Sequence, residues 1–231
     1  MTPPAVAQHE LLEVAPAAFR RFRAMLGVAV LLAFPVALAA DRHVATFFQS
    51  VRVGGDLRRE LEFVQQFGAV TSCLIVAAAI ALLDPVRRRL LPRAAIAIIA
   101  TAAAAWALKV LVGRPRPRLD EPYLFLGPWS EHAFTKGDQT VTMHAWEFWR
   151  GPSDLWSMPS SHTAAACALA VVIARLYPRL TPLMISLACI VGVARVVLGA
   201  HYPSDVVIGG ALGATIASLM PLSSRPLPTA R

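Results

Sequence analysis

The sequence has little charge for its length. Only 16% of its 231 residues are Asp, Glu, Lys or Arg, whereas 56% are hydrophobic and the mean hydropathy is +0.56. A soluble domain of this size needs a larger polar share to cover its surface. The composition therefore argues against a soluble protein and indicates that the lipid bilayer is its solvent.

Cysteine is also scarce. The three cysteines are Cys73, Cys167 and Cys189, and each lies inside an apolar run. An odd number of thiols in such runs argues against a disulfide framework. We expect these small side chains to pack between helices.

Long apolar runs take the place of charge. They lie near residues 24–40, 66–83, 94–112, 162–177, 181–200 and 203–221. A helix needs about 20 residues to cross a bilayer core of about 30 Å, and about 17 are tolerated. Such runs are too long for strands of a membrane barrel. The sequence therefore predicts an all-α bundle of six transmembrane helices in a single domain, residues 1–231.

The N-terminal segment allows two interpretations. Residues 1–19 are rich in Pro and Ala, and we expect them to be loosely ordered. The first apolar run follows arginines and ends in small residues, as a cleavable signal peptide does. We favour a retained first helix, because the distribution of charge fits six spans.

The basic residues are distributed unevenly. Residues 1–23, 84–93, 175–181 and 222–231 hold eleven arginines and three acids, which accounts for the whole net charge of +8. Since cytoplasmic segments are enriched in Lys and Arg, we expect both termini to be cytoplasmic. No contiguous basic domain is present, so nucleic acid is not an expected partner.

Three motifs fall at the opposite ends of these runs. They are Lys109-x6-Arg116-Pro117, Pro159-Ser160-Ser161-His162 and Arg195-x5-His201-x3-Asp205. Three cations can neutralise a phosphate and the charge that develops on it in a transition state. Two histidines and a carboxylate supply the groups for nucleophilic attack and proton transfer. The motifs predict one phosphate-handling site on the non-cytoplasmic face.

Local spacing predicts how two motifs are held. Pro203 suits the first turn of a helix beginning near Tyr202, which puts Asp205 about one turn beyond His201. Asp205 would then accept the Nδ1–H of His201 and leave Nε2 free. Ser160 is a natural N-cap, and free N–H groups at that helix start, including those near Ser161, attract phosphate.

The order and spacing of the motifs resemble the type 2 phosphatidic acid phosphatase family, which is related to vanadium haloperoxidases and some bacterial acid phosphatases. The resemblance implies that His201 is a nucleophile forming a phosphohistidine, that Asp205 orients it and that His162 is the general acid. It also implies phosphate binding by Lys109, Arg116 and Arg195, with no metal or other cofactor. The sequence departs from the family pattern at Ser161, where glycine is usual, and at Ala194, where serine is usual.

Structural alternatives exist for several of these residues. Lys109 could simply extend from a helix end toward water. Arg116 could belong to a generic basic flank, as Arg114 and Arg118 suggest. His201 and Asp205 could form a structural pair. His132 and His144 lie among acids, but no tight ligand spacing supports a metal site.

Outside the motifs, three patterns predict local structure. Residues 118–158 hold Trp129, Trp146, Trp149 and Trp156. We expect this extracytoplasmic loop to lie over the site and contact lipid, although the rings could instead pack the loop on itself. Residues 53–67 are typical of an amphipathic helix at the membrane interface or of a lead-in to the second span, and a solvated linker is the alternative. Gly209 and Gly213 favour close helix packing within one chain over a dimer interface.

These patterns together predict a metal-independent membrane lipid phosphatase. It would cleave a phosphate or pyrophosphate from a phospholipid, polyprenyl or lipid A substrate at the periplasmic face of a bacterial inner membrane. A neutral His201 beside a protonated His162 predicts a bell-shaped pH profile. Alternatives are a phosphotransferase, a haloperoxidase or a non-enzymatic membrane relative such as a transporter, whose charges would lie nearer the midplane. No protein partner is evident.

Overall fold

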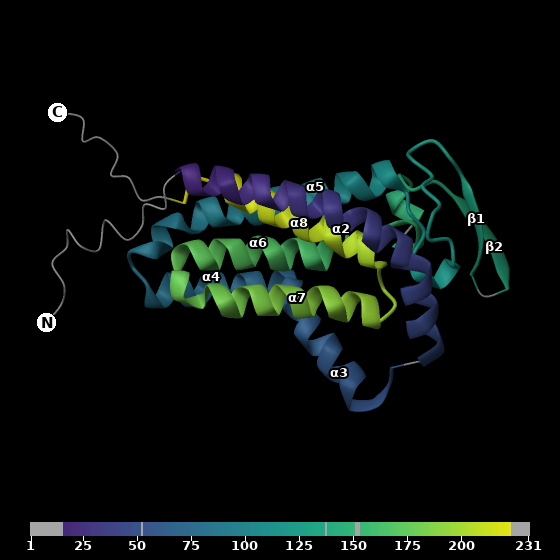
Figure 1. Cartoon of the computed structure of the whole chain (residues 1–231), viewed down its shortest axis with the longest axis horizontal. Coiled ribbons are helices and arrows are strands. Elements are labelled where there is room, and N and C mark those ends of the chain that lie inside the picture. The colour runs from purple at the N-terminus through teal and green to yellow at the C-terminus, as the bar shows by residue number, and fades with distance from the viewer. Residues whose placement is uncertain (1–15, 52, 137, 151–152, 223–231) are drawn as a thin grey trace, which may run out of the picture.

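The computed structural model describes residues 16–51, 53–136, 138–150 and 153–222. Its helices are α2 (Pro16–Val51), α3 (Gly55–Val64), α4 (Val70–Leu83), α5 (Leu91–Val112), α6 (Ser161–Leu176), α7 (Thr181–Val197) and α8 (Pro203–Leu219). All but α3 run lengthwise alongside one another, and α3 angles away from the bundle (Figure 1).

Each predicted apolar run coincides with a helix, although the boundaries differ. Helix α2 starts at Pro16 and so includes the end of the segment expected to be loosely ordered; residues 1–15 lie outside the described part. The second run starts later than predicted, because a 3-10 turn at Gln65–Gly68 separates α3 from α4. Residues 55–64 form the amphipathic helix expected within 53–67.

The helices differ in their capacity to cross a bilayer. In the described residues, the stretches Phe19–Val51, Arg87–Leu119 and Pro178–Val197 are long and apolar enough to span. The pair Gly55–Gly68 and Val70–Leu83, bent by 59°, would make a fourth span. Helices α6 and α8 have 16 and 17 residues and are apolar but shorter. Length and composition thus support a multi-pass membrane protein with three or four candidate spans.

Helices α6 and α8 pack closely at the centre of the bundle. A Cβ added at Gly209 would lie 2.6 Å from the carbonyl oxygen of Ser160, and one at Gly213 would overlap with the carbonyl oxygen of Ala164. The small residues predicted to mediate packing within one chain do so here. Their closeness fixes the start of α6 against α8, which is where two of the motifs lie.

The outer surface of the bundle is apolar. Leu31 and Leu32 on α2, Leu82 and Leu83 on α4 and Ile99 on α5 are all more than 65% exposed. The buried core beneath them is built largely from alanines and small aliphatic side chains. Soluble proteins rarely expose so many large apolar side chains, so this surface fits a chain surrounded by lipid.

Arginines collect at one end of the bundle. Arg87 pairs with Asp84 at 2.6 Å, and Asp84 also accepts a hydrogen bond from the Tyr177 hydroxyl. Arg175 donates to the carbonyl oxygens of Ala217 and Met220, where α8 ends. A cation at a helix C-terminus satisfies carbonyls that have no partner within the helix.

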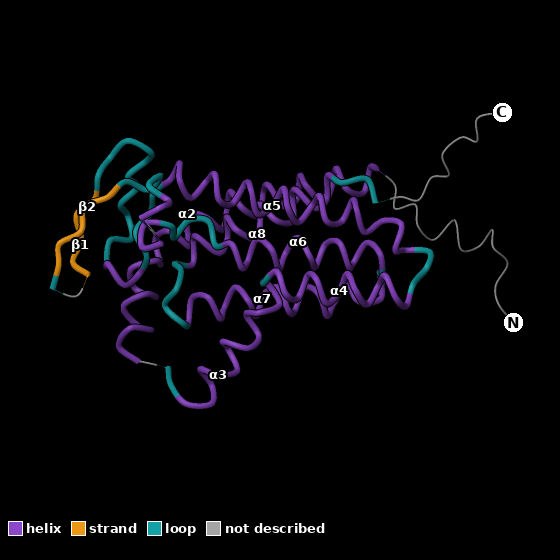
Figure 2. Tube along the Cα trace, turned by 180° about the vertical axis from the view of Figure 1, so that it is seen from behind, coloured by secondary structure: helices purple, strands orange, loops and turns teal. Residues whose placement is uncertain are grey.

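The prediction of an all-α chain is wrong for the long loop. Strands β1 (His132–Lys136) and β2 (Gln139–Met143) form an antiparallel hairpin in which His132 pairs with Met143. It projects beyond the helix ends (Figure 2). Strand β2 alternates Thr140 and Thr142 with Val141 and Met143, and Met143 is buried, but four residues of alternation are too few to indicate a strand on their own.

Substituting Gly213 tests the close packing of α6 on α8. Gly213→Ala should destabilise the protein by about 1–3 kcal/mol or more, because the new methyl group overlaps backbone that cannot move freely. The readout is thermal unfolding in detergent. Gly210→Ala on the same helix is the control, since its Cβ would stay 3.4 Å from the nearest atom. Equal stability of the two variants would contradict the packing described.

Candidate active site

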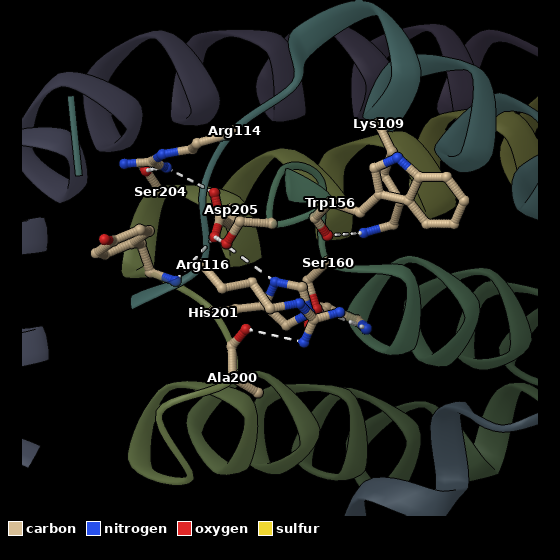
Figure 3. Close-up of polar contacts among 12 residues, drawn as sticks. Lys109, Arg114, Arg116, Trp156, Ser160, Ala200, His201, Ser204 and Asp205 are labelled. Carbon is tan, nitrogen blue, oxygen red and sulfur yellow. Dashed lines mark hydrogen bonds and ion pairs between the residues drawn. The ribbon is translucent and has the colours of Figure 1, made fainter. Parts of the chain in front are cut away.

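The three sequence motifs meet at the end of the bundle opposite the arginine-rich end. They come from the C-terminus of α5 and the loop after it, from the N-terminus of α6 and from the turn between α7 and α8. The side chains of Lys109, Arg116, Ser160 and His201 lie together in Figure 3. His162 interacts electrostatically with Lys109, Arg116 and Arg195, so the second motif belongs to the same cluster.

His201 is held in a tight turn. Helix α7 ends at Val197, and Gly199 takes the left-handed backbone conformation (φ 65°) that lets the chain reverse. The backbone N–H groups of Ala200 and His201 donate to the carbonyl oxygen of Arg195, at 3.1 and 3.2 Å. This ties the histidine to the arginine of its own motif, and the His201 side chain is almost fully buried.

Asp205 lies in the first turn of α8, as its spacing from His201 predicted. Tyr202 is the N-cap and Pro203 the first residue of the helix. The Nδ1 atom of His201 is 3.6 Å from Oδ2 of Asp205, which is longer than a direct hydrogen bond but close enough for an ion pair when the imidazole carries a positive charge. Nδ1 has no other hydrogen-bond partner within the described residues, so the carboxylate is the group it faces.

The carboxylate of Asp205 is fully buried and fully partnered. Oδ1 accepts a hydrogen bond from Arg114 at 2.6 Å. Oδ2 accepts from the Ser157 hydroxyl at 2.5 Å and from the Tyr202 backbone N–H at 2.8 Å. These contacts keep a buried carboxylate charged and fix its orientation toward His201.

Sequence reasoning missed two of these partners. Arg114 was grouped with Arg118 as part of a basic flank, yet Arg114 is completely buried whereas Arg118 is exposed and pairs with Asp154. No local pattern separates the two arginines, because both follow the same helix and each lies next to a proline. Ser157 gave no signal either, since a serine in a long loop has many ordinary roles.

Three cations lie around the pair, and none of them forms a salt bridge within the part of the chain that the structure describes. Lys109 is buried, and its Nζ donates to the carbonyl oxygen of Trp156 at 2.7 Å. Arg116 donates through Nε to the carbonyl oxygen of Ser153 at 2.7 Å. Arg195 donates to the side-chain oxygen of Gln65. Neutral oxygens thus orient these side chains and leave their charge available to a bound anion.

The electrostatics of this cluster favour an anion. Lys109, Arg116 and Arg195 repel one another, and Asp205 attracts Lys109 and Arg116. The Nε atom of Arg195 is buried without a hydrogen-bond partner in the described part of the chain. A dianionic group placed among these side chains would relieve the repulsion.

The N-terminus of α6 completes the site. Ser160 is the predicted N-cap, and its Oγ accepts from the Thr163 hydroxyl at 2.9 Å. Its own N–H donates to the carbonyl oxygen of Asp205 at 3.1 Å, so Ser160 joins α6 to α8. Ser161 is exposed and His162 half-buried. The side chain at 161 therefore does not pack into the protein interior.

Burial controls the protonation of His201. The apolar surroundings, together with Lys109 and Arg116, lower the pKa of His201 to about 3, although Asp205 acts in the opposite direction. A histidine is neutral at any pH above its pKa. His201 is therefore a neutral imidazole, the form that can attack an electrophile, throughout the ordinary pH range.

The long loop lies partly against the site. The segment from Ser153 to Ser157 provides contacts to Arg116, Lys109 and Asp205. Trp156 donates its indole N–H to the carbonyl oxygen of Ala145 at 2.8 Å, so this ring packs the loop on itself. Trp129 and Trp149 are 86% and 62% exposed. Trp156 thus packs the loop on itself, whereas lipid contact by the exposed rings stays a prediction.

The two histidines of the loop lie beside different acidic residues. His132 lies 2.8 Å from Glu121, and His144 lies between Glu131 and Glu147 at 3.9 and 3.7 Å. No group of three or more His, Cys, Asp or Glu side chains that could hold a metal occurs in the described residues.

A cavity of about 510 Å³ opens beside the site. Its lining includes Leu198 and Gly199 from the turn that holds His201, and Arg118 from the loop that holds Arg116. The rest of the lining is Phe48, Gln49, Val53, Arg58 and Val197. The cavity thus combines apolar side chains with two arginines.

Comparison with known proteins agrees with the motifs. The sequence profile of the PAP2 superfamily matches residues 91–226, more than half of the chain. The match includes all three motifs. The chain belongs to the PAP2 superfamily.

Particular relatives are membrane-lipid phosphatases by name. Lipid A 1-phosphatase from Rhizobium johnstonii is 44% identical over 64 residues, 28% of this chain and 26% of that protein. Decaprenylphosphoryl-5-phosphoribose phosphatase from Mycobacterium tuberculosis is 41% identical over 69 residues, 30% of this chain and 37% of that protein. The matched stretches thus span between a quarter and two-fifths of these relatives.

A solved structure has the same fold. The transmembrane PAP2 type phosphatidylglycerolphosphate phosphatase from Bacillus subtilis superimposes with a TM-score of 0.53 at 19% sequence identity. The superposition covers 87% of this chain and 91% of that protein. The superposition therefore covers more of the chain than residues 91–226, which the family profile matches.

Inorganic phosphate tests the cation cluster without any turnover. Phosphate should raise the thermal unfolding midpoint of the purified protein, because a ligand that binds only the folded state stabilises it. In Arg195→Gln, the phosphate concentration that gives the same rise in unfolding midpoint should be at least about tenfold higher, since the substitution removes one charged donor.

Arg179→Gln is the matched control, because Arg179 lies in the turn at the far end of α7. An equal phosphate response in wild type and Arg195→Gln would contradict the assignment of the cluster as an anion site.

Proposed function

We propose that the protein is a membrane phosphatase that hydrolyses a lipid phosphate or pyrophosphate through a phosphohistidine at His201. The observation that carries this proposal is the convergence of Lys109, Arg116 and Arg195 on a buried, neutral histidine that faces a fixed carboxylate. Membership of the PAP2 superfamily and the names of the matching relatives support the same reaction.

In the first step, the phosphate lies among the three cations. Nε2 of His201 attacks the phosphorus atom and forms a P–N bond while the bond from phosphorus to the leaving oxygen breaks. His162 donates a proton to that oxygen, which leaves as an alcohol or a phosphate. Asp205 stabilises the positive charge that the imidazole of His201 gains.

In the second step, water attacks the phosphohistidine. His162, now neutral, accepts a proton from the water, whose oxygen bonds to phosphorus as the P–N bond breaks. Inorganic phosphate leaves, and His201 returns to its neutral form. The two steps need no metal, and each charged species faces a residue of opposite charge.

The membrane arrangement is part of the proposal. We infer that six helices cross the bilayer, with α6 and α8 crossing inside the bundle, where neighbouring helices cover their ends. The arginines at the far end of the bundle favour a cytoplasmic location for that end and for both termini. The site would then face the periplasm of a bacterial inner membrane, with exposed Trp129 and Trp149 at the lipid interface.

The substrate class follows from the surroundings of the site. An apolar outer surface puts the site at the level of lipid headgroups. The adjoining cavity adds Arg58 and Arg118 to apolar side chains, a combination that suits an anionic headgroup joined to hydrocarbon. We propose a phospholipid, a polyprenyl phosphate or pyrophosphate, or lipid A as substrate.

The test is phosphate release by purified protein in detergent micelles. The panel contains phosphatidic acid, phosphatidylglycerol phosphate, undecaprenyl pyrophosphate and lipid A. We expect release from at least one lipid, and a loss of at least about 1,000-fold in kcat for His201→Ala, because the nucleophile is missing.

His43→Ala is the matched control, since His43 is an exposed histidine on α2. Release that persists in His201→Ala would show that another group attacks. Absence of release from every lipid, by a folded protein, would contradict the proposed hydrolysis.

The same assay between pH 5 and 9 separates the roles of the histidines. Because the pKa of His201 is held near 3, its protonation does not limit activity in this range. Burial and the cations Arg195, Arg116 and Lys109 disfavour a proton on His162 while no phosphate is bound, so we expect His162 to hold its proton only beside the bound phosphate dianion. At saturating substrate the rate should then fall toward alkaline pH as His162 loses this proton, with the acid limb of the profile at or below about pH 5. His162→Ala should remove the alkaline limb, and a flat wild-type profile would contradict the general-acid role.

A further inference from the structure

We propose that Arg114 and Asp41 are positioning residues that set the orientation of Asp205 and, through it, the reactivity of His201. The inference rests on the proposed function. It makes α2 part of the active site, although α2 lies outside the residues matched by the family profile.

The guanidinium of Arg114 is completely enclosed. Arg114, Asp41 and Asp205 all have no exposed surface. Nη1 lies 2.6 Å from Oδ1 of Asp205, and Nη2 lies 2.6 Å from Oδ2 of Asp41. The rings of Tyr202 and Phe125 lie 4.3 and 5.1 Å from its central carbon. Arg114 thus has one position in the fold.

Every donor of this arginine is used. A guanidinium has five N–H groups in a rigid fork. Besides the two carboxylates, Nη1 donates to the Ser204 hydroxyl at 2.7 Å, while Nε and Nη2 both donate to the carbonyl oxygen of Pro122. A lysine would keep the charge but could not make this set of contacts.

The contacts divide the Asp205 carboxylate into two sides. Oδ1 is held by Arg114, whereas Oδ2 faces Nδ1 of His201. Figure 3 shows Arg114 and His201 on opposite sides of Asp205. Oδ2 is itself held by the Ser157 hydroxyl and the Tyr202 N–H. Arg114 adds the charged contact at the other oxygen, and with these two donors it sets how Oδ2 faces the imidazole as positive charge develops there.

Asp41 anchors this arrangement from a distant part of the sequence. Its Oδ1 accepts from the backbone N–H of Ser204 at 3.0 Å, and its Oδ2 also accepts from the Ser204 hydroxyl. Asp41 thus holds both Arg114 and the first turn of α8. Carboxylates suit a helix N-terminus, where N–H groups lack partners within the helix.

The balance of charge separates this cluster from a purely structural ion pair. Asp41 and Asp205 together carry two negative charges against the single positive charge of Arg114. The remaining negative charge faces Lys109, Arg116 and His201, all of which interact electrostatically with Asp205. A neutral Asp41 would shift Arg114 toward Asp205 and weaken the field of Asp205 at His201.

The test compares Arg114→Lys and Asp41→Asn with wild type, using phosphatidic acid in mixed micelles as the probe. We expect kcat to fall about 10–100-fold, because small errors in the position of a catalytic pair are costly. KM should stay within about threefold, since neither side chain lies against the phosphate. Adding Asp41→Asn to Asp205→Asn should cause no further loss, because Asp41 acts through Asp205.

Asp84→Asn is the matched control, since Asp84 is a carboxylate that binds an arginine at the far end of the bundle. An unchanged kcat in folded Arg114→Lys and Asp41→Asn would overturn the proposal. The proposal would also be overturned if the fall in kcat of the double variant equalled the product of the falls in Asp41→Asn and Asp205→Asn, because the two residues would then act independently.

A second readout needs no turnover and so separates this proposal from the proposed function. In ¹⁵N-histidine spectra, the wild-type His201 signal, identified by its loss in His201→Gln, should show a proton fixed on Nδ1. In Asp41→Asn and Arg114→Lys it should become a mixture of tautomers. A tautomer unchanged in both variants would overturn the positioning role even if the protein hydrolyses no lipid.

Discussion

A charged group buried among apolar helices must have a partner, and the partner of Asp205 organises the rest of this site. Removing one member of a buried ion pair typically costs about 3–5 kcal/mol, because the other charge is left unpaired. Here Arg114 lies between Asp205 on α8 and Asp41 on α2, with no exposed surface on any of the three. The position of His201 follows, since it faces the oxygen that Arg114 leaves free.

The close approach of α6 and α8 is the second constraint, and it depends on residues without side chains. Gly209 lies against the carbonyl group of Ser160, so the N-terminus of α6 is held beside the first turn of α8. The Ser160 N–H then reaches the carbonyl oxygen of Asp205. Packing that concerns only small residues therefore brings the second and third motifs together, while the loop after α5 brings the first.

Most of the helices and the candidate site could be predicted from the sequence, because both leave local signals. Apolar runs mark the helices, Ser160 and Pro203 mark two helix starts, and the spacing of His201 and Asp205 places them one turn apart. Arg114, Asp41 and Ser157 could not be found in this way. Their roles depend on contacts between residues 48 to 163 positions apart, which no local pattern encodes.

The hairpin of residues 132–143 was missed for a different reason. Its strands have five residues each, and the alternation that places Val141 and Met143 toward a small core cluster covers too few residues to indicate a strand by itself. The start of α4 was placed too early because Phe67 and Gly68 of the 3-10 turn run directly into the apolar stretch that follows, and no proline marks the bend.

Trapping the phosphohistidine is the most direct test of the central claim, that His201 attacks phosphorus. The protein would be mixed with a lipid phosphate that it hydrolyses, and the reaction would be stopped with alkali, which preserves a P–N bond. Mass spectrometry would then locate the phosphorylated peptide. The account predicts phosphate on His201 in wild type, and a higher occupancy in His162→Ala when the substrate has a good leaving group, because water attack then lacks its base. Phosphate on another residue, or turnover without a covalent phosphate on His201, would contradict it.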